Sequence, residues 1–138
     1  MVERLPGAVL YDPEPLGAAL RPMLASIDPV VDFQDLRPWR QLVVDTARVL
    51  RETYARPLVM PMTVLRLDYL EELMAGLQQV DEELHCFRLV APELVLRARI
   101  LGRPDGDGPH AWCLEHLADG VRLMRDDRVP GSGVDQEA

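Results

Sequence analysis

Residues 57–64, Pro-Leu-Val-Met-Pro-Met-Thr-Val, are the segment that most restricts how this chain can fold. A short apolar run bounded by prolines, with helical patterns before and after it, is typical of a buried parallel strand whose crossover connections cover both faces of a sheet. Two further apolar runs occur at residues 8–11 and 84–90. The sequence therefore predicts an α/β fold, a parallel sheet of three recognisable strands with helices on both faces.

The segments between these runs carry helical periodicity. Helices are expected at residues 16–24, 35–54, 68–77, 92–103 and 112–124, with Asp35 capping the second of them and Trp39 in the core. Residues 1–125 should form one domain. The polar, Gly-containing residues 126–138 are expected to be a flexible tail.

The charge balance restricts the partners. The chain of 138 residues has 23 acidic and 15 basic residues, a net charge of −8, which disfavours nucleic acid and anionic membranes. No run is long enough to span a membrane, no export signal begins the chain, and two cysteines lack the spacing of a disulfide framework. We therefore expect a cytoplasmic protein with no nucleic-acid or membrane partner.

Five segments, in this order and spacing, carry a resemblance to a known family. They are residues 11–14, residues 32–35 with Trp39-Arg40, residues 56–63, residues 90–93 with 96–100, and Trp112 with His116-Leu117. Together they resemble the small bacterial P-loop proteins that include the tunicamycin-resistance ATP-binding protein. Wider relatives are kinases of nucleotides and small molecules, including chloramphenicol phosphotransferase. The resemblance implies a P-loop-kinase-like fold, a small-molecule acceptor and an antibiotic-resistance role.

The resemblance also shows what is missing. Members of that family begin with a strand and a Gly-x-x-Gly-x-Gly-Lys-Thr/Ser loop that binds the phosphates of ATP and Mg²⁺. Neither this loop nor any lysine occurs in the sequence. ATP and Mg²⁺ are thus the implied cofactors of a completed enzyme, whereas the chain as given is predicted to be truncated and inactive. A mis-assigned start is the plainer explanation.

The missing strand would lie between the counterparts of residues 57–64 and 84–90, and residues 133–135 are at best a remnant of the family's final strand. Removing a central strand leaves two apolar strand edges unpaired. We expect either that the two neighbouring strands pair directly, or that a second copy fills the gap in a homodimer.

The resemblance also suggests site residues. Asp12 would be the general base towards the acceptor hydroxyl, and Arg99 and Arg103 would stabilise charge on the transferring phosphoryl group from a mobile lid. The acceptor would be held by residues near the carboxyl ends of the strands: Glu14, Phe33, Asp35 and Arg40.

Each assignment has an alternative. The alternative for Asp12-Pro13 is a turn, and the alternative for the lid arginines is a solvated helix face. Arg40 would otherwise pair at the surface with Asp35 or Asp45, and Phe33 would pack in the core.

No metal site is expected. His110, Cys113 and His116 are spaced by three residues, and on a helix such positions do not converge on one ion. The leading hypothesis is therefore a kinase-like relative of ATP-dependent small-molecule phosphotransferases. The alternatives are a non-catalytic small-molecule-binding protein and a dimerising remnant of that fold.

Overall fold

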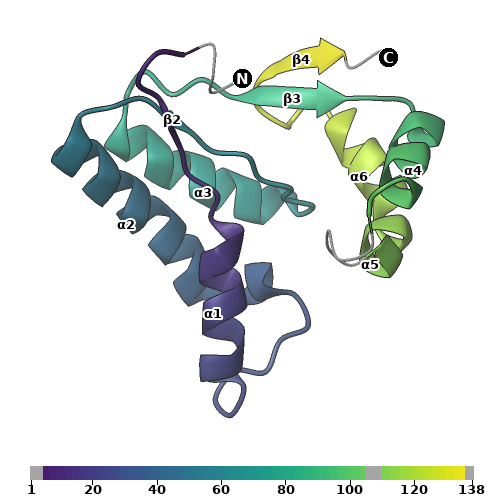
Figure 1. Ribbon diagram of the computed structural model, residues 1–138, viewed down its shortest axis with the longest axis horizontal. Helices are drawn as coiled ribbons and strands as arrows, with labels where there is room; N and C mark the ends of the chain where they lie inside the picture. The colour runs from purple at the N-terminus through teal and green to yellow at the C-terminus, as the bar shows by residue number, and fades with distance from the viewer. Residues whose placement is uncertain (1–4, 105–109, 136–138) are drawn as a thin grey trace. The chain divides into compact units, whose positions relative to one another are not determined.

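The computed structural model of the chain describes residues 5–104 and 110–135 (Figure 1). It is a mixed α/β structure with small parallel sheets and many helices. The chain divides into two compact units, where the sequence predicted one domain. Unit 1 comprises the residues up to Val64 together with Asp68–Leu84, and unit 2 comprises Leu65–Leu67 and the residues from His85 onward.

Unit 1 contains a parallel pair of strands, β1 (Val9–Leu10) and β2 (Leu58–Val59). Val9 lies opposite Leu58 and Leu10 opposite Val59. The predicted strands are confirmed here, with shorter bounds. Prolines at positions 57 and 61 bracket β2, and a proline has no backbone N–H to extend the pairing.

Unit 1 also contains three α-helices and one 3-10 helix. They are α1 (Glu14–Leu24), the 3-10 helix η2 (Phe33–Asp35), α2 (Arg37–Tyr54) and α3 (Leu67–Val80). The expected cap of α2 by Asp35 is wrong. Leu36 is the N-cap residue of α2, because Asp35 is still inside η2, and η2 is itself capped by Asp32, whose Oδ1 accepts a hydrogen bond from the Gln34 N–H over 2.9 Å.

The core of unit 1 forms along α2. Positions 36, 39, 43 and 47 recur at helical spacing, and Leu36, Trp39, Val43 and Ala47 are all buried. The first three pack with Val64 and Leu73, whereas Ala47 packs with Tyr11 and Leu77. The prediction that Trp39 is a core residue is confirmed, since only 2% of it is exposed.

Unit 2 contains the second sheet, in which β3 (Phe87–Val90) pairs in parallel with β4 (Ser132–Asp135). Its helices are α4 (Glu93–Leu101), α5 (His110–Glu115) and α6 (Leu117–Met124). Arg88 of β3 donates from Nη1 to the carbonyl oxygens of Met124 and Asp126, which ties the strand to the end of α6.

The expected tail is wrong for residues 126–135. Val129 is only 3% exposed, and residues 132–135 form a strand of their own. Gly131 leads the chain into this strand with φ of 108°, and a Cβ there would lie 2.6 Å from the Cys86 carbonyl oxygen. Glycine at this position therefore permits the close approach that starts β4 beside β3.

Of the two alternatives expected for the strands beside the missing one, direct pairing is wrong, whereas a second copy filling the gap stays a prediction. Within residues 5–104 and 110–135, β2 pairs with β1 and β3 pairs with β4, so the strands fall into two two-stranded sheets. Direct pairing between β2 and β3 would have required one continuous sheet. None of the helices in the described parts of the chain is long and apolar enough to cross a membrane.

Candidate functional site

The candidate site of unit 1 lies where β1 and β2 end. Parallel strands present their carboxyl ends at the same edge, where ligands of open α/β sheets bind. Asp12 comes just after β1 and is exposed, and its Oδ1 accepts a hydrogen bond from the Glu14 N–H over 3.0 Å. Asp12 therefore does form the turn that was the alternative interpretation. The general-base role stays a prediction, as does the acceptor-binding role of the exposed Glu14.

Gln34 joins η2 to the segment that follows β2. Its Nε2 donates a hydrogen bond of 2.6 Å to the carbonyl oxygen of Thr63. Sequence reasoning missed this residue, because the contact spans 29 positions and a lone glutamine carries no sequence signal. The bond ties the turn to this segment at Thr63, four residues beyond the end of β2.

Phe33 is partly buried and packs against the core of unit 1. Its ring meets the ring of Trp39 edge-on, with centroids 5.1 Å apart, and also lies against Gly17. The arrangement matches the core alternative for Phe33. A contact between the acceptor and the accessible part of the ring stays a prediction.

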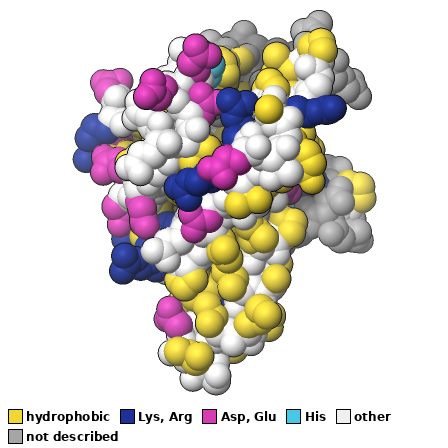
Figure 2. All heavy atoms as spheres, turned by 90° about the vertical axis from the view of Figure 1, so that its left-hand side faces the viewer, with side chains coloured by type: hydrophobic (Ala, Val, Ile, Leu, Met, Phe, Trp, Pro, Cys, Tyr) yellow, Lys and Arg dark blue, Asp and Glu magenta, His cyan; other side chains and the backbone are white. Residues whose placement is uncertain are grey.

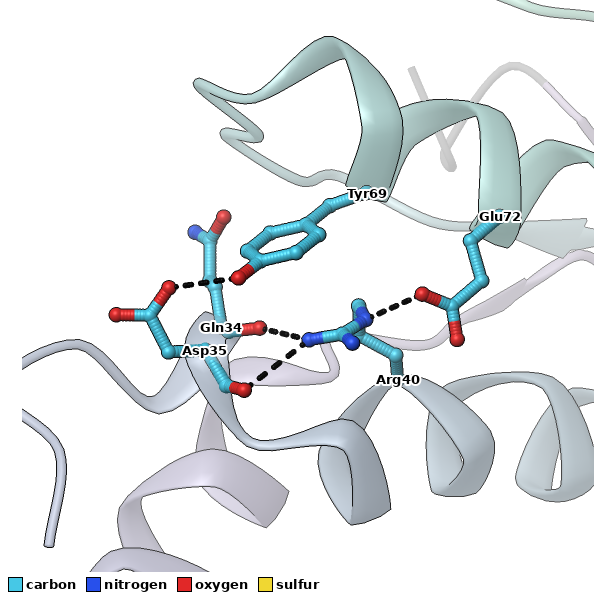
Figure 3. A network of polar contacts seen from close by, with 5 residues as sticks. All are labelled: Gln34, Asp35, Arg40, Tyr69 and Glu72. Atoms are coloured by element: carbon cyan, nitrogen blue, oxygen red, sulfur yellow. Dashed lines mark hydrogen bonds and ion pairs between the residues drawn. The ribbon is translucent and has the colours of Figure 1, made fainter.

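Arg40 is enclosed by groups of unit 1 (Figure 3). Only 8% of the residue is exposed. Its Nε donates to Glu72 Oε2 over 2.6 Å, and its Nη1 donates to the carbonyl oxygens of Gln34 and Asp35 over 2.6 and 3.3 Å. The guanidinium carbon also lies 4.0 Å from the centre of the Tyr69 ring. The carboxylate partner of Arg40 is thus Glu72, rather than the Asp35 or Asp45 of the sequence alternative.

Asp35 is exposed and accepts a hydrogen bond of 2.9 Å from the Tyr69 hydroxyl at Oδ1.

The two predicted lid arginines belong to unit 2. Arg99 lies in the last turn of α4, whereas Arg103 follows the end of that helix and places Nη1 4.0 Å from Cys113 Sγ. Arg103 therefore lies outside the helix that was predicted for residues 92–103, because α4 ends at Leu101. Their lid role stays a prediction.

One of the residues considered for a metal, His116, is engaged otherwise. His116 stacks on Trp112, and its Nδ1 lies 2.9 Å from the Trp112 carbonyl oxygen. In the part of the chain that the structure describes, no group of three or more His, Cys, Asp or Glu residues could hold a metal ion.

A hollow lies on α1 and the loop that follows it. It is a shallow groove of about 390 Å³ lined by Ala18, Arg21, Pro22, Ala25, Pro29 and Val30. Exposed apolar side chains on the same segment are Met23, Ile27 and Val31. Figure 2 shows hydrophobic side chains gathered towards the lower end of its view, the end at which α1 lies in Figure 1.

Comparison with known proteins gives one informative likeness. No protein-family model and no curated protein matches the chain. Among solved structures, the chain is similar to the tunicamycin resistance protein of Deinococcus radiodurans, with 25% sequence identity and a TM-score of 0.73. The match covers 95% of this chain and 73% of that protein.

This likeness supports the resemblance that was drawn from the five sequence segments. A TM-score of 0.73 over nearly the whole chain means that the two proteins share their mixed α/β architecture. The structure is consistent with a P-loop-kinase-like fold.

Proposed function

We propose that this chain is the acceptor side of a kinase-like protein of the antibiotic-resistance type, and that it binds a small molecule at the carboxyl edge of β1 and β2. The observation that carries the proposal is the arrangement at this edge. The exposed Asp12 carboxylate follows β1, and the bond from Gln34 to Thr63 ties η2 to the segment that follows β2. A structural neighbour named for tunicamycin resistance supports the class of ligand.

The roles of the side chains follow from their chemistry. Asp12 would accept the proton of an acceptor hydroxyl, because a carboxylate within hydrogen-bond reach of a hydroxyl can act as its general base. Glu14 and Asp35 would accept hydrogen bonds from other polar groups of the acceptor, and Phe33 would contact an apolar part. Tunicamycin is the first probe to try.

The described residues do not fit the implied cofactors. ATP and Mg²⁺ require a phosphate-binding loop and oxygen ligands. The sequence contains no lysine and no Gly-x-x-Gly-x-Gly-Lys-Thr/Ser run, and the described residues include no metal-binding cluster. We therefore assign no phosphoryl-transfer step to these residues. In a version that supplied the nucleotide-binding unit, the same edge would present the acceptor.

The test is isothermal titration of the full chain with tunicamycin. The variants are Asp12→Asn and Glu14→Gln, and Glu52→Gln is the matched control because it removes the same charge from an exposed position of α2. Loss of one charged hydrogen bond should weaken binding by about tenfold at Asp12 or Glu14. The control should bind like the wild type. Binding that neither variant weakens would place the ligand elsewhere.

A parallel titration with ATP and Mg²⁺ tests the other half of the proposal. No binding at micromolar concentrations is expected, because the sequence has no phosphate-binding loop and residues 5–104 and 110–135 contain no metal-binding cluster. Micromolar affinity for ATP would show that these residues bind nucleotide by other means and would overturn the assignment.

A second candidate function is self-association. Within the described residues, β2 and β3 each pair along one side only, and an unpaired strand edge is a template for another strand. The face of β3 that carries Phe87 and Leu89 is also exposed. Sedimentation velocity over a concentration series would detect a dimer, and a monomer throughout would remove this candidate.

A further inference from the structure

We infer that Arg40 is a positioning residue, which holds the η2 turn against α2 and α3 instead of contacting the acceptor. The link to the acceptor rests on the function proposed above. The attachment of the turn stands on the contacts alone.

The contacts of the guanidinium converge on the turn. Nη1 donates to two consecutive carbonyl oxygens, those of Gln34 and Asp35, while Nε donates to Glu72 of α3. Removing a cationic side chain from this position would leave these acceptors without their donor. Burying an arginine lowers the stability of the fold unless its N–H groups are hydrogen-bonded. The need to pair these groups therefore largely determines where the turn lies.

A second attachment comes from α3. The Tyr69 hydroxyl donates to Asp35 Oδ1, and the ring of the same tyrosine lies against the Arg40 guanidinium. Figure 3 shows the two side chains approaching the turn from their separate helices. The turn that carries Phe33 and Asp35 is thus held from α2 and from α3 together.

Little of Arg40 remains for a ligand. One face of the guanidinium lies against Tyr69, and Nε and Nη1 are already donors within the protein. The small groove of about 240 Å³ that Arg40 lines also carries the carboxylates of Asp45 and Glu72. These negative charges disfavour a phosphate or carboxylate group of an acceptor.

The contacts of Arg40 depend on the planar, forked shape of its guanidinium group. A lysine keeps the charge, but its compact ammonium lacks the planar fork that reaches the turn and Glu72 while stacking on Tyr69. The variant Arg40→Lys therefore tests geometry rather than charge. Arg48→Lys is the matched control, because Arg48 is on the same helix and pairs with the nearby Asp45 at the surface.

The first measurement is amide hydrogen exchange on the full chain. The Asp35 and Leu36 amides close η2 by donating to the Asp32 and Phe33 carbonyls. Their exchange should become about tenfold faster in Arg40→Lys, because the turn opens locally, and should not change in Arg48→Lys. Amides in the middle of α2 should keep their protection in both variants.

The second measurement is the dissociation constant for tunicamycin. If Arg40 only stabilised the fold, this constant would be unchanged in a folded variant. It should rise about fivefold or more in Arg40→Lys and stay constant in Arg48→Lys. If Arg40→Lys does not fold, Glu72→Gln replaces it, since this change weakens one attachment and keeps the two carbonyl bonds. Glu72→Gln should show the same effects to a smaller degree.

The outcomes separate the two proposals. Unchanged exchange at Asp35 and Leu36 overturns the positioning role. Faster exchange with an unchanged dissociation constant overturns its link to the acceptor. If the wild-type chain does not bind tunicamycin at all, the proposed function fails for that ligand, and the exchange result alone decides whether Arg40 holds the turn.

Discussion

The indole Nε1 of Trp39 donates a hydrogen bond of 3.0 Å to the carbonyl oxygen of Pro13. Both side chains are buried, so the bond lies inside unit 1. It joins α2 to the turn that follows β1 and thereby fixes the backbone next to Asp12. Trp39 consequently has a polar role in addition to its apolar packing.

Replacing Trp39 by Phe should lower the free energy of unfolding by about 1 kcal/mol, because the Pro13 carbonyl loses the indole N–H and keeps the Leu16 N–H as its donor. Urea unfolding followed by circular dichroism measures the change. Trp112→Phe is the control, because Trp112 is only partly buried and a phenylalanine can still stack on His116. An equal loss in both variants would show that ring volume, and not the hydrogen bond, is decisive.

Gly17 of α1 is buried against Phe33, and a Cβ at this position would overlap the phenylalanine ring. Gly17→Ala should cost about 1–3 kcal/mol of stability, because the ring is held by Trp39 on another side and cannot simply move away. The additional change Phe33→Ala should lower the free energy of unfolding by less in the Gly17→Ala variant than in the wild type. Chemical unfolding of the single and double variants gives the coupling.

The control for this pair is Gly133→Ala, since nothing lies within 4 Å of a Cβ built at Gly133. It should unfold at the wild-type urea concentration. A stable Gly17→Ala variant would mean that α1 and η2 adapt to the added methyl group.

The strands were predictable to different degrees. The segments containing β1, β2 and β3 are apolar runs, and the sequence shows them directly. β4 is Ser-Gly-Val-Asp, in which valine is the single large apolar residue. Its strand conformation comes from pairing with β3, more than forty positions earlier in the chain. No local pattern reports a pairing over that distance.

The site was predictable where local chemistry decides. The turn at Asp12 and the core position of Trp39 follow from a proline neighbour and from helical spacing. The partner of Arg40 did not follow, because Glu72 is 32 positions away and is brought to Arg40 by the packing of α3 on α2. The acidic residues close in sequence, Asp35 and Asp45, were the natural but wrong choices.

Tyr11 should make the stability of the protein fall with rising pH in the alkaline range. Burial raises the pKa of its phenol, an effect that the Thr46 side chain partly offsets by hydrogen bonding. A raised pKa in the folded state means that the neutral phenol is favoured there. This contribution is fully present below the ordinary tyrosine pKa of about 10 and is lost as the pH rises through the raised value.

Urea unfolding between pH 9 and pH 11 should therefore show a falling free energy of unfolding at the upper end of that range, about where tyrosine ionises. Tyr11→Phe should flatten this fall, although it costs about 1 kcal/mol at neutral pH through the lost bond to the Val43 carbonyl. Tyr54→Phe is the control, since Tyr54 is 60% exposed. A slope that is the same in both variants would exclude Tyr11 as its source.

Cys86 should be the slower of the two cysteines to react with iodoacetamide. Burial raises the pKa of its thiol, and the charge of Arg88 offsets only part of that effect. The Cys86 Sγ also donates to the Pro130 carbonyl oxygen over 3.4 Å, which holds the protonated form. Since the thiolate is the nucleophile, alkylation at neutral pH should be several-fold slower at Cys86 than at Cys113. Mass spectrometry of quenched time points measures both rates. The two rates should converge in urea, where burial is lost, and equal rates in the native protein would contradict the prediction.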